Sequence, residues 1–549
     1  MSGGKATEKL DCDVLIIGGG AAGSRAAYEA KKAHPELKVL MAVSGGFGTS
    51  GSTNLIASES LGINAPFDFM KDGDNPDAYY RDMIETGGGL SDPQLCRIVA
   101  DEACERVNEL IGLGVRFDEA EGHPIQRKLS GCTKARSLTC GGSTGREIVA
   151  ALRRELIKLG VEILEKVRVF DLIQDNHGRV CGVTAFSTLT PLYIDTGAIV
   201  LASGGAGRIF RYHVNPPFQE GDGWCMAYRA GARLINMEFF QIGPAVFKPS
   251  IQFIIHSHMW RLRPRLTNRL GEEFLPRYCP PGVDPQEVLD CKAMSYPFSV
   301  RTASKYLDIA LFKETKEGRG TAAGGVYFDV THIGKKVLEE QAPITYRMLK
   351  QAGVDLSEEK IEIGMVVKNF NGGILIDGRG FTGVDGLYAA GEVTGGVHGA
   401  DRPGGNNLTD TQVFGYRAGR ACAEYARGLH RRQGGFHPPA SKGVGPLSPR
   451  DEAIISQSSD LYSAHLTVVR RARGLQEVLQ FIRSEEGSAH PFVENRLLLG
   501  SLIGTAALTR DESRGTHYRE DFPQNNAEWI KRVVLSRGKA GKPAVTIFP

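Results

Sequence analysis

The stretch CDVLIIGGGAAGSRAAYEA, residues 12–30, decides how the chain folds. It opens with a mainly apolar run rich in branched side chains, which predicts a parallel strand buried on both faces. Gly18, Gly20 and Gly23 follow with the spacing GxGxxG, and a helical pattern comes directly after them. A second apolar strand at 38–43 completes a βαβ unit. Glycines in such a unit let the backbone approach a pyrophosphate, so the opening predicts a dinucleotide-binding domain.

The end of the second strand departs from the pattern typical of nicotinamide dinucleotides. An Asp or Glu is expected there to bind the ribose hydroxyls, but residues 41–44 read Met-Ala-Val-Ser. Ribose contacts must then come from Ser44 or from a backbone group, which favours FAD over NAD. The loop at 44–54 is rich in Gly, Ser and Thr and is a second candidate for facing phosphates or rings. Its candidate cofactor-binding residues are Ser44, Ser50, Gly51 and Ser52.

The composition is that of a globular protein. Charged residues make up 23% and hydrophobic residues 41% of the 549, which argues against disorder. Lys and Arg total 66 against 63 Asp and Glu with no basic block, so nothing in the charge pattern indicates a nucleic-acid partner. No apolar stretch reaches the ~20 residues of a membrane helix, and the start lacks a signal-like apolar core. We therefore expect a cytoplasmic protein with no transmembrane segment.

The ten cysteines bear on cofactors and partners. None forms a CxxC pair and no run has a ferredoxin spacing, so we expect free thiols in a reducing compartment. Any iron–sulfur cluster would have to come from another chain. No set of residues in the sequence predicts a metal site, since the pair His256 and His258 has no third ligand in register.

Strand and helix patterns recur along the chain and change character twice. Buried-strand patterns occur at 161–202 and 372–392, whereas a stretch rich in aromatics, prolines and basic residues begins near 235 and indicates an inserted domain. Helical spacing fills 451–510 and predicts a small bundle. The expected segments are 1–234, the insert at 235–355, 356–432, a Gly/Pro/Ser linker at 433–449, the helical domain at 450–523 and a weakly patterned tail at 524–549.

Two further helices are predicted within the dinucleotide-binding part. Asp92 precedes a helical pattern that closes at Gly112 and Gly114, as expected for a capped helix. The pattern at 412–429 predicts a second helix, which follows the last buried strand.

A second cofactor signal lies far from the first. The strand that begins at Gly386 ends in Ala-Gly-Glu, which places the Glu392 carboxylate where it can accept hydrogen bonds from ribityl hydroxyls. Another predicted strand ends in Gly204 and Gly205. Three segments far apart in the sequence thus agree on an α/β, two-part Rossmann-like FAD-binding domain.

At this point the chain resembles the flavoprotein subunits of succinate dehydrogenase and fumarate reductase, together with L-aspartate oxidase. The similarity spans nearly the whole length. The motifs that carry it are GGGAAG at 18–23, STGRE at 143–147, GDG at 221–223, NMEFFQ at 236–241, NRLGEEF at 268–274, DVTHIG at 329–334, HGADRPGGNNLTD at 398–410 and ESRGTHYREDFP at 512–523. The resemblance implies an FAD-dependent oxidoreductase, with the insert as a capping domain that closes over a small anionic or carboxylate substrate.

The resemblance also implies which residues lie near the cofactor. Some relatives attach FAD through a histidine in the loop after the second strand, but 44–54 contains none, so we expect non-covalent FAD. The expected cofactor-binding residues are Gly18, Gly20, Ala21, Gly23, Ser44, Ser50, Gly51, Ser52, Gly204, Asp222, Glu392, Asn406, Asn407 and Leu408.

The catalytic positions depart from the family pattern. The family's His-Pro-Thr-Gly segment, whose His and Thr hold a substrate carboxylate, corresponds here to Gly-Pro-Ala-Val at 243–246. Tyr306 stands at the position of the proton-donating arginine, and Lys368 replaces the His before Met-Gly-Gly. Arg402 is retained and His398 matches a family histidine. Each lost hydrogen bond to a carboxylate costs ~1.5–3 kcal/mol, so efficient succinate, fumarate or aspartate chemistry is not expected.

Each candidate catalytic residue has an alternative, purely structural interpretation. Arg402 anchors a substrate carboxylate or forms an ion pair with a nearby aspartate. His398 faces the flavin or substrate, or supports a Gly-rich turn. Lys368 is a cation for an acidic substrate, a desolvated base or a solvated surface residue. Tyr306 is a proton donor or a core residue on a helix.

Three functions compete on this sequence. The first is a flavoenzyme that moves a hydride between an organic acid and the flavin. The second is an electron-transfer subunit whose FAD exchanges electrons with an iron–sulfur partner chain. The third is a flavin-binding scaffold with an inactive site. We favour the first, with the second as its alternative.

Overall fold

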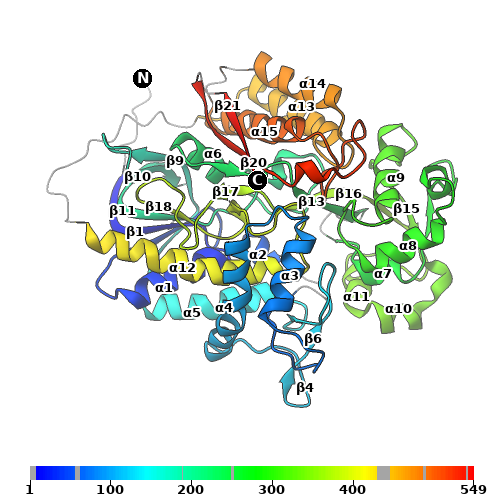
Figure 1. The fold of residues 1–549 in the computed structure, drawn as a ribbon, viewed down its shortest axis with the longest axis horizontal. Coiled ribbons are helices and arrows are strands. Elements are labelled where there is room, and N and C mark those ends of the chain that lie inside the picture. The colour runs from blue at the N-terminus through cyan, green and yellow to red at the C-terminus, as the bar shows by residue number, and fades with distance from the viewer. Residues whose placement is uncertain are drawn as a thin grey trace.

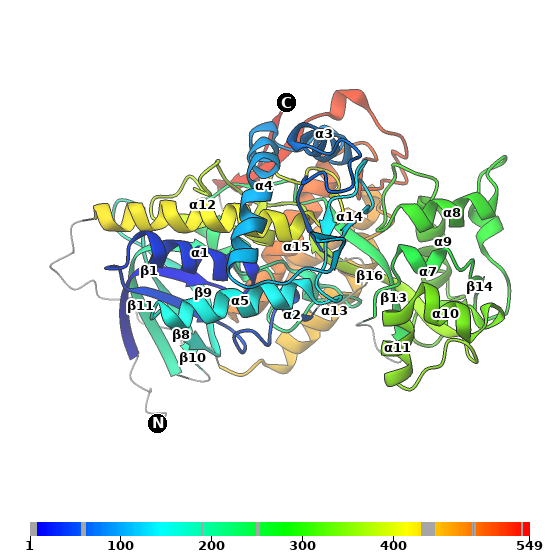
Figure 2. The same ribbon diagram turned by 90° about the horizontal axis from the view of Figure 1, so that it is seen from below.

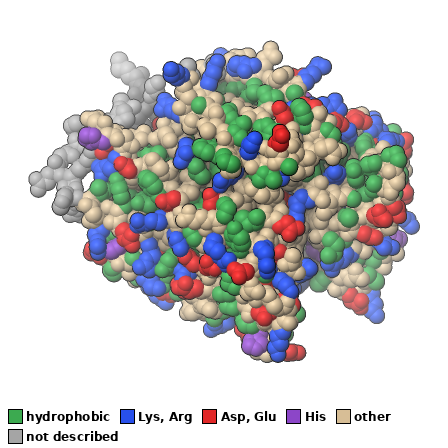
Figure 3. All heavy atoms as spheres, viewed as in Figure 1, with side chains coloured by type: hydrophobic (Ala, Val, Ile, Leu, Met, Phe, Trp, Pro, Cys, Tyr) green, Lys and Arg blue, Asp and Glu red, His purple; other side chains and the backbone are tan. Residues whose placement is uncertain are grey.

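The computed structural model describes residues 8–55, 62–187, 190–248, 253–429, 445–485, 487, 490–539 and 542–549. Its elements gather around two hydrophobic cores, and the smaller core stands to one side in both ribbon views (Figure 1 and Figure 2). On the face shown in Figure 3, Lys and Arg side chains are interspersed with Asp and Glu. No helix within the described residues is long and apolar enough to cross a membrane.

The larger core is built on a sheet with the strand order β8-β2-β1-β11-β10-β9, with β18 paired to β11. Val14 of β1 is fully buried and lies beside Val39 of β2 and Ala198 of β11 in parallel register, as expected for a strand covered on both faces. The strands are β1 (Glu8–Ile17), β2 (Val39–Val43), β8 (Glu162–Glu165), β9 (Val167–Gln174), β10 (Val180–Ser187), β11 (Thr190–Leu201) and β18 (Leu387–Ala389).

Helices cover this sheet, and α1, α5 and α12 lie together on one side of it (Figure 1). Two further helices, α3 and α4, pack against each other, and α4 also packs on α12. Asp92 caps α4 by accepting from the backbone N–H groups of Gln94 and Leu95. The helices are α1 (Ala21–Ala33), α2 (Ser52–Leu55), α3 (Pro76–Thr86), α4 (Pro93–Gly112), α5 (Thr144–Lys158), η1 (Gly207–Ile209), α6 (Asp222–Arg229), η4 (Gly391–Val393) and α12 (Asn406–Gly428). Short strands in the same part are β3 (Ile63–Asn64), β4 (Glu119–Ala120), β5 (His123–Pro124), β6 (Gln126–Arg127) and β7 (Ser137–Leu138).

The second core draws its buried residues from Val246 to Ile363, within and just beyond the expected insert. Its sheet has the order β13-β16-β15-β14, and β13 and β16 extend back toward the first core as an antiparallel pair. The elements are β13 (Phe240–Lys248), α7 (Ser257–Trp260), β14 (Arg265–Thr267), η2 (Leu275–Tyr278), α8 (Pro285–Met294), α9 (Lys305–Lys316), β15 (Val326–Asp329), η3 (Thr331–Ile333), α10 (Lys335–Gln341), α11 (Pro343–Gln351) and β16 (Ile361–Phe370).

The C-terminal region contains the expected helices and an unexpected hairpin. The helices are α13 (Pro449–His465), α14 (Ala472–Ser484) and α15 (Pro491–Thr509), while most of the expected linker lies outside the described residues. The tail, whose sequence is only weakly patterned, contains β20 (Arg532–Arg537) and β21 (Pro543–Phe548), which pair and join a sheet of order β19-β17-β12-β20-β21. The other members are β12 (Leu234–Ile235), β17 (Gly373–Leu375) and β19 (Thr394–Gly395), with η5 (Ala527–Trp529) preceding β20.

Candidate functional site

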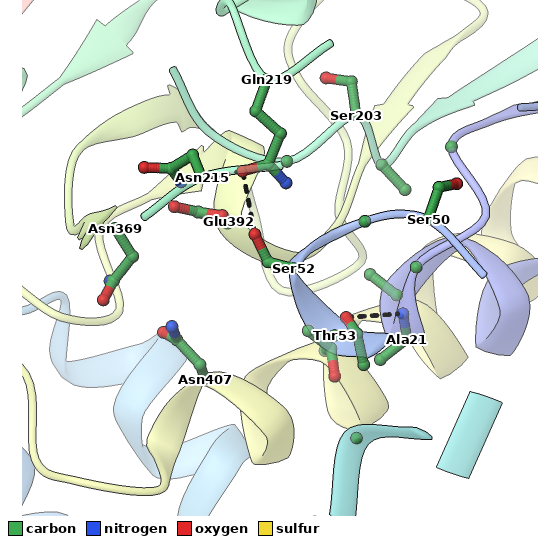
Figure 4. A pocket seen from close by; sticks show the side chains of 18 of the residues that line it. Ala21, Ser50, Ser52, Thr53, Ser203, Asn215, Gln219, Asn369, Glu392 and Asn407 are labelled. Carbon is green, nitrogen blue, oxygen red and sulfur yellow. Dashed lines mark hydrogen bonds between the residues drawn. The ribbon is translucent and has the colours of Figure 1, made fainter. Parts of the chain in front are cut away.

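A long cavity runs from the N-terminus of α1 to the loop before α12. It lies at the carboxyl ends of β1, β2, β11 and β18, which is where open parallel sheets bind ligands. Of the sequence-predicted cofactor residues, those that line it are Gly18, Gly20, Ala21, Ser44, Ser50, Gly51, Ser52, Gly204, Glu392, Asn407 and Leu408. Figure 4 shows the polar side chains that surround its middle.

The glycine turn at one end requires its glycines. Gly18 has a φ of +114°, and a Cβ there would lie 2.2 Å from the carbonyl oxygen of Ala202. Gly23 does not line the cavity, but a Cβ on it would lie 1.9 Å from the carbonyl oxygen of Gly18. The close packing of helix on strand that the motif predicts is therefore present. Gly20 caps α1 without a side-chain hydrogen bond, so the start of the helix presents backbone N–H groups to an anion.

The loop after β2 is held by residues that the sequence analysis did not single out. The Ser52 hydroxyl donates to Gln219 Oε1 at 2.9 Å, and Asn215 Nδ2 donates to the same oxygen at 2.9 Å. Thr53 Oγ1 accepts from the backbone N–H of Ala21 at 3.3 Å. The first and third of these contacts are drawn in Figure 4. Gln219 and Asn215 belong to no motif, so no sequence signal pointed to them.

Glu392 lies at the middle of the cavity, where the sequence predicted a carboxylate. Its Oε1 accepts from the backbone N–H of Phe370 at 3.1 Å. A Cβ on Gly205 would lie 2.4 Å from the same oxygen, so only glycine leaves the carboxylate room. Loss of hydration raises the pKa of Glu392 to about 7. A carboxylate in this state gains from hydroxyl donors, which the ribityl chain of FAD carries.

The cavity therefore fits FAD on its own geometry. A glycine turn at the start of a helix stands at one end, and a buried carboxylate with a raised pKa stands further along. Ser203 also lines the cavity, but its buried hydroxyl points toward Gly223 of α6 and has no hydrogen-bond partner within the described part of the chain.

Arg402 lies beyond Glu392 and faces the cavity. Its Nη2 donates to Gln241 Oε1 at 2.6 Å, and Nη1 donates to the carbonyl oxygen of Pro403 at 2.9 Å. No ion pair joins its guanidinium to a carboxylate among the residues that the structure describes, and Asp401 instead accepts from its backbone N–H. Burial lowers the pKa of Arg402 to about 10. A buried guanidinium with no bonded carboxylate and an unpartnered Nε can take up an anion.

The place of the missing family histidine is filled by an aromatic ring. A Cβ on Gly243 would lie 2.7 Å from Tyr296 Oη, and that hydroxyl donates to the carbonyl oxygen of Pro244 at 3.3 Å. Lys368 Nζ lies 4.3 Å from the centroid of the Tyr296 ring and lines the cavity. Lys368 is therefore not the solvated surface lysine that one interpretation allowed. Burial, then the charge of Arg402, lowers its pKa well below 10.5.

The structure does not bring the other two catalytic candidates to the cavity. His398 is buried beside Asp410 of α12, with Nε2 3.8 Å from Oδ2, and burial lowers its pKa. Tyr306 lies at the start of α9, where it packs against the second core and lies under Lys305 Nζ at 5.2 Å. Neither residue lines the cavity, so their structural interpretations describe their surroundings better.

Two expected cofactor residues also point elsewhere. The Asp222 carboxylate accepts hydrogen bonds from Arg168 Nη2 at 2.6 Å and from Asn495 Nδ2 at 2.8 Å, which link α6 to β9 and α15. Asn406 Oδ1 accepts from Asn64 Nδ2 at 2.7 Å behind the cavity wall. Within the described residues, no group of three or more His, Cys, Asp or Glu side chains is placed to hold a metal.

Comparison with known proteins gives one consistent result. A family model described as "FAD binding domain" matches residues 13–408, and one described as "Fumarate reductase flavoprotein C-term" matches 489–549. The chain is 35% identical to a subunit of the "Fumarate reductase (CoM/CoB)" of Methanothermobacter marburgensis, over 97% of this chain and 98% of the relative. It is 30% identical to an L-aspartate oxidase of Caulobacter vibrioides, over 96% of each.

Solved structures agree with this grouping. A chain of "Mycobacterium smegmatis Sdh1 in complex with UQ1" shares 28% identity and a TM-score of 0.84 with this chain, over 98% of this chain and 94% of that one. A chain of "Quinol-Fumarate Reductase with Menaquinol Molecules" shares the fold with a TM-score of 0.81 at 23% identity, over 99% of this chain and 98% of that one.

Proposed function

We propose that this chain, which belongs to the family of succinate dehydrogenase and fumarate reductase flavoprotein subunits and is an FAD-dependent oxidoreductase, exchanges a hydride with an organic acid other than succinate, fumarate or aspartate. Bound FAD supplies the hydride chemistry, because its oxidised ring accepts two electrons with one hydrogen. The loop at 44–54 offers no histidine for a covalent bond, so the FAD is proposed to be held non-covalently.

One observation carries the proposal on substrate choice. The Tyr296 ring occupies the space beside Gly243 in which the side chain of the family histidine would begin, and Ala245 carries no hydroxyl. A dicarboxylate entering this cavity loses both of those donors, each of which is worth ~1.5–3 kcal/mol to a charged group. The basic side chains that line the cavity within the described residues are Arg402 and Lys368.

Arg402 is the proposed anchor for one carboxylate or an equivalent anionic group. Gln241 orients the guanidinium by a 2.6 Å hydrogen bond and leaves its Nε without a partner among described residues. A substrate with a single anionic end matches this supply of donors better than one with two.

The test is an anaerobic screen in which organic acids are mixed with the purified flavoprotein and flavin absorbance is followed. We expect bleaching by an acid outside the succinate, fumarate and aspartate set. A triple variant that restores the two donors and removes the ring in their way, Gly243→His with Ala245→Thr and Tyr296→Ala, is then compared with the parent for fumarate reduction. A parent that already reduces fumarate as fast as efficient fumarate reductases would show that the substrate proposal is wrong.

A second candidate function is supported by a different observation. The relative from Methanothermobacter marburgensis is named as one subunit of its enzyme, and all ten cysteines of this chain are free. We propose as the alternative that FAD here exchanges electrons with an iron–sulfur partner chain, in the cytoplasm. Purification under anaerobic conditions decides between them: a Cys-rich partner that oxidises the reduced flavin supports the alternative, and a flavoprotein that purifies alone counts against it.

A further inference from the structure

We propose that Lys368 is the group that exchanges a proton with the substrate, and that the buried pair Lys292–Asp308 tunes it through the ring of Tyr296. The inference rests on the proposed function, because it assigns a role within the same cavity. It goes beyond anion binding, since a residue that only binds an anion has no need to change its protonation state.

The two lysines share one aromatic ring. Lys368 Nζ lies 4.3 Å and Lys292 Nζ lies 5.4 Å from the centroid of the Tyr296 ring. Only Lys368 reaches the cavity, where its neighbours on the wall are Asn369 and Arg402. Lys368 belongs to β16, whereas Lys292 and Tyr296 come from α8 and the segment after it. The second core thus places a charged residue directly behind the cavity wall.

Lys292 is paired inside the protein. Its Nζ donates to Asp308 Oδ2 at 2.6 Å, and both side chains are 0% exposed. A buried ion pair gains little stability over an apolar pair of similar volume, because both charges lose their hydration. The presence of this one beside a cavity-facing lysine therefore suggests a role other than holding the core together.

The charges around Lys368 are unbalanced. Lys292 has Asp308, but no hydrogen bond or ion pair joins Lys368 Nζ to a carboxylate within the described residues. The groups that face it from other elements are Arg402, Lys292 and Tyr296, and the His256 ring lies 5.4 Å from the Tyr296 ring. The charges of Glu392 and Asp401 act on Arg402. Desolvation first, and then the charges of Arg402 and Lys292, lower the pKa of Lys368. The amine is therefore neutral at a pH where an ordinary lysine is charged.

A neutral amine facing the substrate can complete the reaction. With FAD bound, the flavin would accept a hydride, which leaves one C–H bond of the substrate with both electrons. The adjacent bond to hydrogen breaks as well, and its electron pair forms the new double bond while the proton passes to Lys368 Nζ. In the reverse direction the ammonium returns that proton. Positioned groups of this kind contribute about 10²–10⁴-fold to rate.

The first experiment needs no turnover. The FAD-loaded protein is labelled with trace acetic anhydride between pH 6 and 10, and peptides are quantified by mass spectrometry. We expect Lys368 to become reactive at lower pH than the exposed Lys335, whose side chain is 57% exposed. In the paired variant Lys292→Met with Asp308→Leu, which removes both charges together, the profile of Lys368 should move toward that of Lys335. Equal profiles for the two lysines in the parent protein would overturn the tuning.

The second experiment separates proton exchange from anion binding. Lys368→Met should slow flavin reduction by the acid found in the screen about 100-fold, and Lys368→Arg should restore the KM but not the rate, because a guanidinium stays protonated. Rescue of the rate by arginine would show that Lys368 only binds the anion. The matched control is Lys360→Met, since Lys360 also lies over a ring, that of Tyr327 at 3.8 Å, but at an exposed position just before β16.

The third experiment measures the rate of flavin reduction as a function of pH. The paired Lys292→Met and Asp308→Leu variant should reduce its flavin more slowly at pH 7 and recover at higher pH, because Lys368 then needs a higher pH to lose its proton. If the pH profile of this variant is the same as that of the parent, the pair Lys292–Asp308 does not tune Lys368. If no acid reduces the flavin while the labelling profile of Lys368 is displaced, the proposed function fails and the proton role fails with it, but the tuning stands.

Discussion

The two ends of the cavity are built in different ways. At the cofactor end, Gly18 and Gly23 bring backbone against backbone within one βαβ unit. At the substrate end, Tyr296 reaches β13 from the segment after α8 and fills space left by Gly243. Close backbone approach leaves a regular glycine spacing in the sequence, whereas filling by a distant side chain leaves no spacing at all. The first end can therefore be read along the chain, and the second only from the packed molecule.

The largest effect should come from breaking the cofactor end. Gly23→Val places a branched side chain where a Cβ would already lie 1.9 Å from the carbonyl oxygen of Gly18. We expect less than a tenth of the flavin per chain found in the parent, measured as the ratio of absorbance at the flavin and protein bands. The control is Gly112→Ala at the end of α4, where a Cβ would meet nothing within 4 Å. Full flavin content in Gly23→Val would contradict the proposed helix–strand contact.

At the substrate end, Arg402→Met should leave the flavin bound but weaken binding of the organic acid substrate. Two charge-assisted hydrogen bonds to an anion are each worth about 1.5–3 kcal/mol, so the rate of flavin reduction at low substrate should fall about 100-fold or more. Stopped-flow absorbance of the flavin measures this rate. Arg473→Met on the exposed face of α14 serves as control, because that side chain is 90% exposed. Unchanged kinetics would remove Arg402 from the substrate site.

Glu392 lies between the two ends of the cavity, and its titration should make the free energy of unfolding depend on pH. Its pKa is raised to about 7 in the folded protein against an ordinary 4.5, so the folded state holds its proton more tightly. Stability from this group is therefore fully present below pH 4.5 and is lost as the pH rises toward 7, by up to about 3 kcal/mol. Urea unfolding of the apoprotein at pH 5 and pH 8 tests this. In Glu392→Gln we expect that part of the pH dependence to disappear, and an unaltered dependence would assign it to other groups.

The smallest effect should come from refilling the substrate end. Gly243→His overpacks the site against Tyr296 and should destabilise the protein by about 1–3 kcal/mol in urea unfolding. Adding Tyr296→Ala should recover part of that loss, because the ring then no longer occupies the space. Gly112→His is the comparison, at a position open to solvent. Equal losses in the single and double variants would mean that the ring does not replace the histidine.

The sequence predicted those features that depend on contacts between residues close together in the chain. The β1-α1-β2 unit and the cap of α4 by Asp92 depend on neighbours in the chain, and the patterns predicted both. The pattern placed the start of α12 at residue 412, but the helix begins at Asn406, because its polar first turn is held by Asn64 from far away in the sequence.

The β20–β21 hairpin was missed for a related reason. Its partner in the sheet is the two-residue strand β12, some three hundred positions earlier. Asp308 could have been singled out from the sequence, since it interrupts the apolar run of α9. A carboxylate in such a run indicates a buried cation nearby. Gln219 and Tyr296 act through contacts that no local pattern encodes.

The sheet that supports the centre of the cavity also fixes when it can be completed. Thr394, two residues past Glu392, pairs with Ile374 of β17, and the sheet continues through Leu234 of β12 to Leu535 of β20. Strand β20 is synthesised some five hundred residues after the glycine turn. The glycine turn can therefore fold early in synthesis, while stable flavin incorporation has to wait for translation to reach the hairpin.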